Sequence, residues 1–153
     1  MDRAAFRTFA QGAVAAALVA WGAALVAAGD QAPDPAASVF TLKQAADGKA
    51  AYAKHCASCH IADLSGNSEI PALAGPAFRE MWDTRSTKEL FDYMSAAMPY
   101  GAPSLTVDEY TAIVAYVLQV NGAAAGEREL TPSTAVPIGA VAKSASASAS
   151  PGR

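Results

Sequence analysis

The sequence predicts an all-α domain of three to five helices. Three segments begin with the pattern Ser/Thr-x-x-Glu/Gln, the capping box in which the first and fourth residues satisfy each other's backbone N–H groups. Apolar residues recur with helical spacing after these starts, and no segment alternates apolar and polar residues with the period of two that marks a strand. All three starts lie between residues 41 and 122. We therefore expect one small helical domain and no sheet.

The first capping box, Thr41 to Gln44, predicts a helix that runs through Ala50 and Tyr52 towards Cys56. The segment from Ile61 to Gly75 follows. Because Gly and Pro interrupt it repeatedly, it reads as a loop.

Two further helices are expected after this loop. Ser86 to Glu89 starts one that ends before Pro99, because proline cannot continue a helix. Thr106 to Glu109 starts the other, which stops at Asn121-Gly122. The apolar stripe of this last helix consists of Tyr110, Ile113, Val114, Val117 and Leu118, spaced by three and four residues.

The N-terminus indicates export. Arg3 and Arg7 precede a stretch from Ala10 to Ala28 that is apolar apart from Gln11. The small residues at its end predict a signal peptide over 1–28 with cleavage after Ala28. The alternative is an uncleaved membrane anchor, since the stretch approaches the roughly 20 residues that span a bilayer.

The rest of the chain divides by composition. Residues 29–40, with Pro33 and Pro35, predict a leader or tether, and residues 41–130 hold the domain. Residues 131–153 are rich in Ser, Ala and Pro and predict a disordered tail. The formal net charge is −3, and loss of 1–28 makes it slightly more negative. This balance argues against nucleic acid and anionic membranes as partners.

The motif Cys56-Ala-Ser-Cys59-His60 is the strongest signal in the chain. C-x-x-C-H is the attachment signal of a c-type haem, in which two thiols add to the vinyl groups of the porphyrin and the histidine binds iron. One such motif predicts one covalent haem c, with His60 as a metal ligand.

Three other interpretations of the two cysteines are weaker. A thioredoxin-like site needs a βαβ setting. A structural zinc site needs four ligands, and His55 is the only other His or Cys in the chain. A plain disulfide of an exported protein would not require the adjoining histidine.

At this point the chain resembles the class I c-type cytochromes with a single haem. Gly48, Tyr52 and Cys56 repeat the family's G-x-x-x-aromatic-x-x-x-C pattern, and the Pro71–Gly75 segment is similar to its P-x-L-x-G loop. The Ile113–Tyr116 segment is similar to the last-helix motif, which crosses the first helix. The resemblance implies a small cytochrome c fold wrapped around the haem.

Within that family the resemblance is closest to the cytochromes, and cytochrome domains, that accompany pyrroloquinoline-quinone-dependent dehydrogenases. It rests on Glu89–Tyr93, on Met98-Pro99 and on Pro103–Thr106.

The second iron ligand is expected to be Met98. It stands at the end of a helix before Pro99, where the chain turns, and the resemblance places the family's axial methionine there. Met94, one helical turn earlier, is the alternative ligand, and Met81 is expected to fill the core.

The resemblance also implies supporting roles around the haem. The Pro71 carbonyl would accept a hydrogen bond from His60, and Leu73 would pack on the ring. An indole N–H and a guanidinium are natural donors to carboxylates, so Trp82 and Arg85 are candidates for holding the propionates. Tyr93 and Tyr100 are weaker candidates, and His55, Lys49 and Lys54 are expected to be solvated helix residues.

His/Met ligation leaves no open iron position, so the sequence predicts a periplasmic one-electron carrier and not an enzyme. Its partners would be a dehydrogenase donor and an oxidase or cytochrome acceptor. Two alternatives stay open: a haem enzyme or gas sensor in which Met98 is displaced, and a fixed electron-transfer subunit of a larger dehydrogenase. The chain shows no nucleophile–base pair.

Overall fold

The computed structural model describes residues 38–141. Its helices are α1 (Leu42–His55), α2 (Ala57–His60), α3 (Gly75–Trp82), α4 (Thr87–Ala97) and α5 (Val107–Val120), followed by a helical turn at 138–141. The described part contains no strand, only an isolated antiparallel bridge between Ser86 and Pro137. The all-α prediction is confirmed.

The three expected helix starts are present as capping boxes. Thr41, Ser86 and Thr106 each accept a hydrogen bond from the backbone N–H three residues on, and the residue at that position returns the bond. The sequence did not single out α2 and α3, because α2 is one turn long and α3 begins without a side-chain cap.

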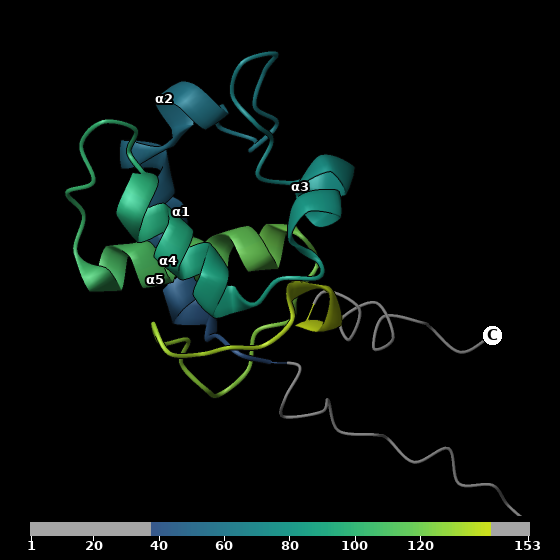
Figure 1. Ribbon diagram of the computed structural model, residues 1–153. Coiled ribbons are helices and arrows are strands. Elements are labelled where there is room, and N and C mark those ends of the chain that lie inside the picture. The colour runs from purple at the N-terminus through teal and green to yellow at the C-terminus, as the bar shows by residue number, and fades with distance from the viewer. Residues whose placement is uncertain (1–37, 142–153) are drawn as a thin grey trace, which may run out of the picture. The chain divides into compact units, whose positions relative to one another are not determined.

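The packing of α1 on α5 is the most extensive contact between helices (Figure 1). Gly48 faces the backbone of Ala112 so closely that a Cβ atom has no room there. Next to this crossing the rings of Tyr52 and Tyr116 are 5.5 Å apart. The helix axes can approach closely only because position 48 carries no side chain.

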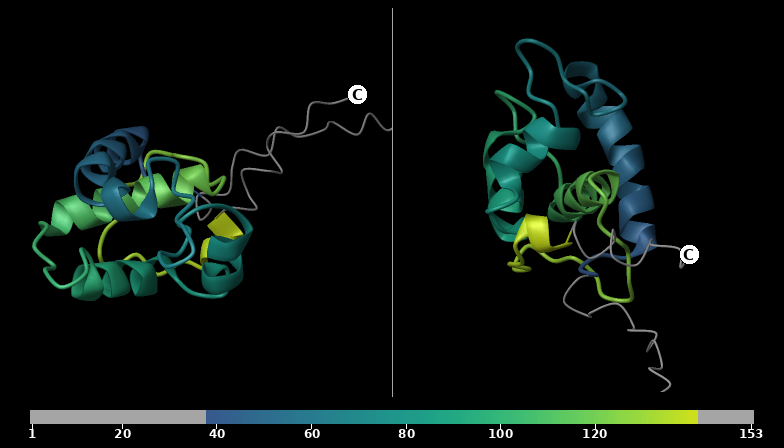
Figure 2. Two further views of the ribbon diagram at one scale, coloured as in Figure 1. Left: turned by 90° about the horizontal axis from the view of Figure 1, so that it is seen from above. Right: turned by 90° about the vertical axis from the view of Figure 1, so that its right-hand side faces the viewer.

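The remaining helices leave a space on one side of this pair. α4 also packs on α5, while α2 continues from the end of α1 (Figure 2). The loop of residues 61–74 then carries the chain across to α3. Residues from α2, this loop, α3, α4 and α5 face the space between them.

The segment of residues 123–141 corrects the expected boundaries. Leu130, Ile138 and Val141 are all buried in the core. Residues 131–141 therefore belong to the domain and are not a disordered tail: their few apolar side chains include members of the buried core, which composition did not reveal.

The expected tether also ends earlier than predicted. Val39 and Phe40 are buried, and the Phe40 carbonyl accepts a hydrogen bond from Gly126 N–H at 2.8 Å. The domain thus begins before Thr41, whereas the predicted signal peptide and the rest of the tether lie outside the described residues. Among residues 38–141, no helix has the length and apolar character needed to cross a bilayer.

The close approach at Gly48 predicts a large effect of a small substitution. Gly48→Ala should destabilise the protein by about 1–3 kcal/mol or more, because the added methyl group forces α1 away from α5. Denaturant unfolding measures the change. Ala46→Ser, at an exposed position of the same helix, should have little effect; equal losses for the two variants would contradict the contact.

Candidate functional site

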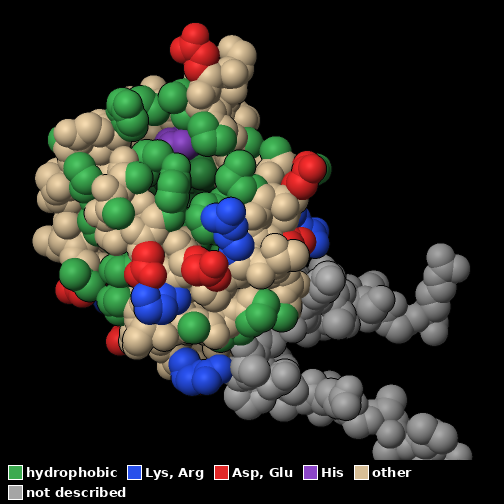
Figure 3. Space-filling view, viewed as in Figure 1, with side chains coloured by type: hydrophobic (Ala, Val, Ile, Leu, Met, Phe, Trp, Pro, Cys, Tyr) green, Lys and Arg blue, Asp and Glu red, His purple; other side chains and the backbone are tan. Residues whose placement is uncertain are grey.

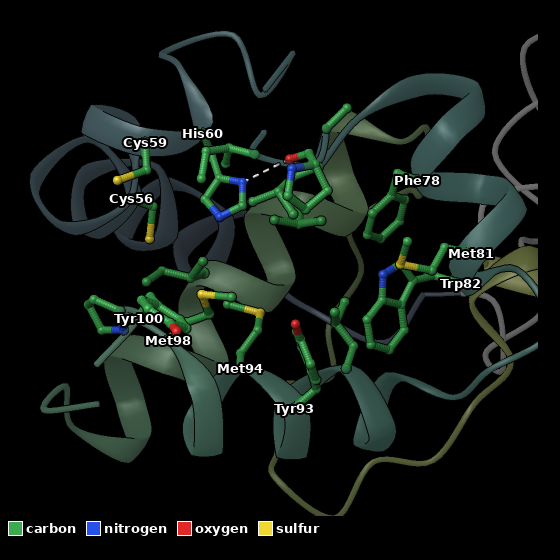
Figure 4. A pocket seen from close by; sticks show the side chains of 18 of the residues that line it. Cys56, Cys59, His60, Phe78, Met81, Trp82, Tyr93, Met94, Met98 and Tyr100 are labelled. Carbon is green, nitrogen blue, oxygen red and sulfur yellow. Dashed lines mark hydrogen bonds between the residues drawn. The ribbon is translucent and has the colours of Figure 1, made fainter. Parts of the chain in front are cut away.

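The site is a pocket between α2, the 61–74 loop, α3, α4 and α5 (Figure 4). It holds about 1070 Å³ of open space, its mouth included. Most of its lining side chains are apolar, among them Phe78, Leu90, Ile113 and Val117. Figure 3 shows hydrophobic side chains gathered over this face of the molecule. A large, flat apolar group would be well accommodated here.

Both cysteines line the pocket as free thiols. Cys56 lies where α1 ends and α2 begins, and Cys59 lies within α2, so one helical turn brings both to the same side. Burial raises the pKa of the Cys56 thiol to about 11, with a smaller contribution from nearby Cys59. Cys59 is exposed.

His60 points into the pocket with one ring nitrogen fixed. Its Nδ1 atom is 2.9 Å from the Pro71 carbonyl oxygen, the bond that the sequence resemblance implies. Because a carbonyl can only accept, Nδ1 carries the proton, which leaves Nε2 with a free lone pair. His60 is buried. This is the tautomer that a metal-binding histidine needs.

The backbone after His60 is held in an unusual conformation. Ile61 has φ 66° and ψ 153°, a combination that β-branched residues rarely adopt. The Tyr52 hydroxyl donates to the Ile61 carbonyl at 2.6 Å, and burial raises the pKa of Tyr52, so the hydroxyl stays a donor. This anchor turns the chain sharply out of α2 immediately after the histidine.

Asn121 holds the loop that supplies the Pro71 wall, a role that sequence reasoning missed. Its amide group donates to the Leu73 carbonyl at 2.9 Å, and its side-chain oxygen accepts from Gly75 N–H at 3.0 Å. Leu73 lines the pocket. Asn followed by Gly is a common sequence at a helix end, so the sequence predicts the end of the helix at Asn121 but not the contacts of its side chain.

Two methionines face His60 across the pocket. Met98 is the C-cap of α4, and Met94 lies one turn earlier; both line the pocket from below in Figure 4. Met98 has an extended backbone, and its carbonyl accepts a hydrogen bond from the Tyr110 hydroxyl, a second contact that the sequence did not indicate. Met94 lies inside α4, and its side chain is buried.

The expectation that Met81 fills the core is wrong. Met81 is 52 % exposed and stands at the rim of the pocket, because it lies on the outer side of the short helix α3.

The propionate candidates lie at different places. Trp82 is buried and lines the pocket, whereas Arg85 does not line it. The Arg85 guanidinium carbon instead lies 5.0 Å from the centre of the Trp82 ring. Tyr93, which packs on Trp82 with ring centres 5.7 Å apart, and Tyr100 are exposed at the mouth.

His55 is less solvated than expected. It lines the pocket, and its Nε2 atom is 3.7 Å from a carboxylate oxygen of Glu109. Lys49 and Lys54 are exposed, as predicted.

These residues fit a covalently attached haem. Two free thiols, a histidine with a free Nε2 and two thioethers converge on one apolar pocket. Thiols, imidazole and thioether are the groups that c-type haem attachment and ligation require.

The comparisons with known proteins agree with this geometry. Residues 43–117, just under half of the chain, match the family model described as cytochrome C oxidase, cbb3-type, subunit III. No curated protein and no solved structure is significantly similar to the chain. The matched region holds all five helices apart from the ends of α1 and α5. This match supports a class I c-type cytochrome with covalent haem c.

The thiol environments predict unequal reactivity before haem is attached. In the reduced protein without haem, iodoacetamide should alkylate Cys59 faster than Cys56 at pH 7, because only thiolates react and a pKa of about 11 keeps Cys56 protonated. The Cys56 rate should rise as pH approaches that value. Mass spectrometry of quenched samples measures both rates; faster Cys56 labelling at pH 7 would contradict the burial.

Proposed function

We propose that this c-type cytochrome domain belongs to an exported one-electron carrier whose haem iron is ligated by His60 and Met98. The observation that supports it is the convergence of His60, both thiols and Met98 on one apolar pocket. The haem supplies reversible one-electron chemistry at its iron. The chain's own residues attach it, hold the histidine tautomer and exclude water.

The choice of Met98 over Met94 follows from their places on α4. Met98 ends the helix with an extended backbone, so its side chain can turn without unwinding a helical turn. Met94 is fixed by helical hydrogen bonding and by burial against the core. A thioether ligand and an apolar pocket both favour the ferrous state and so raise the reduction potential. With Met98 as the second iron ligand, the iron would have no open position, which supports a carrier over an enzyme or gas sensor.

The mouth of the pocket suits brief contact with redox partners. Met81, Tyr93 and Tyr100 are exposed around it, 52 %, 50 % and 93 % respectively. A rim of a few exposed apolar and aromatic side chains suits a small interface, which is typical of short-lived electron-transfer complexes. We propose a dehydrogenase as donor and an oxidase or another cytochrome as acceptor, in the periplasm. Only the sequence motifs support a quinoprotein dehydrogenase among these donors.

A second candidate function is a fixed electron-transfer subunit. The observation that supports it is the description of the matched family, which names a subunit of an oxidase. Size exclusion of the native protein from its host separates the two: a free carrier elutes as a small protein, and a subunit elutes with a larger enzyme.

Covalent attachment is tested by the cysteines. Cys56→Ala or Cys59→Ala should each leave at most one thioether bond, and the double variant should lose haem on denaturation because nothing covalent holds it. Intact-mass measurement after denaturation checks both. The double variant keeping its haem would contradict the attachment.

The axial ligand is tested by the methionines. Oxidised protein should show the weak charge-transfer band of a methionine sulfur on ferric iron, and Met98→Ala should remove it, lower the reduction potential and admit carbon monoxide. Met94→Ala should keep the band and cost about 2–5 kcal/mol of stability, because it leaves a cavity. Loss of the band in Met94→Ala alone would assign the ligand to Met94. No band in the unmodified protein, together with carbon monoxide binding, would favour the enzyme or sensor.

A further inference from the structure

The segment of residues 123–141 crosses the domain outside the matched region and is anchored at two ends. At the first end, the Gln44 side chain bonds the backbone of Leu130 twice, at 2.8 Å each, once as donor and once as acceptor. Gly126 N–H bonds the Phe40 carbonyl nearby. Residues at and just before the start of α1 thus hold the first part of this segment in place.

At its other end the segment holds the corner between α3 and α4, residues 83–87. Ile138 N–H donates to the Arg85 carbonyl at 2.9 Å, and Gly139 N–H donates to the Asp83 carbonyl at 3.0 Å. Gly139 lies so close to Asp83 that an added Cβ would be 2.9 Å from that carbonyl oxygen. We call residues 134–139 the strap.

Thr87 is the central contact between corner and strap. Its N–H donates to the Val136 carbonyl at 2.9 Å, its hydroxyl donates to the Thr134 carbonyl, and the hydroxyl accepts from Val136 N–H at 3.3 Å. Thr87 is 1 % exposed, so none of these bonds competes with water. A buried polar side chain that is fully used in this way is costly to replace by an apolar one.

The corner carries Arg85, which lies against a residue of the pocket wall. Trp82 lines the pocket directly, and Arg85, whose carbonyl the strap holds, places its guanidinium carbon over the Trp82 ring, 5.0 Å from the ring centre. Strap, Arg85 and Trp82 therefore form a continuous series of contacts from the C-terminal segment to the haem pocket.

We propose that the strap, through Thr87, positions the Trp82–Arg85 pair and so helps to set the reduction potential of the haem. Only the claim about the reduction potential rests on the proposed function; the claim that the strap positions Trp82 and Arg85 does not. If the strap is loosened, Arg85 and Trp82 can move outward, and water gains access to the pocket. Loss of a nearby positive charge and of burial both stabilise the ferric state, so the potential falls.

The chain offers a matched pair of variants. Thr87→Val removes the hydroxyl that bonds the strap, while Thr111→Val removes the hydroxyl of another buried threonine, which bonds only the Val107 carbonyl of its own helix. Thr87→Ser keeps a hydroxyl and should restore the bonds. Hydrogen exchange of residues 83–90 and the reduction potential are measured on the haem-loaded full chain.

We expect about fivefold faster exchange of residues 83–90 in Thr87→Val, the effect of losing one net hydrogen bond on local opening. Its potential should fall, and Thr87→Ser and Thr111→Val should leave both readouts near those of the unmodified protein. Exchange in Thr87→Val no faster than in Thr111→Val would overturn the strap's role. This exchange test is valid whether the protein contains haem or not.

The link to the pocket is decided separately. In an Arg85→Gln background, Thr87→Val should shift the potential less than it does alone, because both changes act on the same pair. An unchanged potential despite faster exchange, or shifts that simply add, would overturn the link between the strap and the pocket. A chain that takes up no haem would instead contradict the proposed function and leave the exchange result standing.

Discussion

The close crossing of α1 and α5 at Gly48 is the constraint on which the rest of the structure depends. It fixes the direction of α1, and α1 ends at the residue before Cys56. The position of both thiols and of His60 follows from that direction. α5 in turn supplies Tyr110, whose hydroxyl holds the Met98 carbonyl, so one helix contact places both sides of the pocket. A larger residue at position 48 would therefore displace both sides of the pocket at once.

Hydrogen bonds from side chains to single carbonyls do the finer positioning. Tyr52 holds Ile61, Asn121 holds Leu73, and the Pro71 carbonyl holds His60. All of them act on loops next to the pocket, where no regular helix could satisfy the backbone. An apolar pocket removes part of the core, and a domain as small as residues 38–141 buries little surface to spare. A bound haem would restore that missing core as well as supply the redox chemistry.

The segment of residues 123–141 shows how much a domain boundary depends on tertiary contacts. Its residues 131–141 have the composition of a linker, yet Ile138 and Val141 are part of the buried core. The match to a cytochrome family ends at residue 117, before this segment begins. The strap lies outside the matched residues, and it reaches the pocket wall through Arg85 and Trp82.

The sequence by itself determined the local features. Capping boxes at Thr41, Ser86 and Thr106 are decided within four residues, and C-x-x-C-H is a chemical unit whose meaning does not depend on the fold. Only the tertiary structure decided what is non-local: that Met81 faces solvent, that Arg85 stacks on Trp82 outside the pocket, and that Thr87 is bonded to a segment 47 residues further along the chain. Such contacts join residues far apart in the chain, and no spacing or periodicity records which partner a side chain meets.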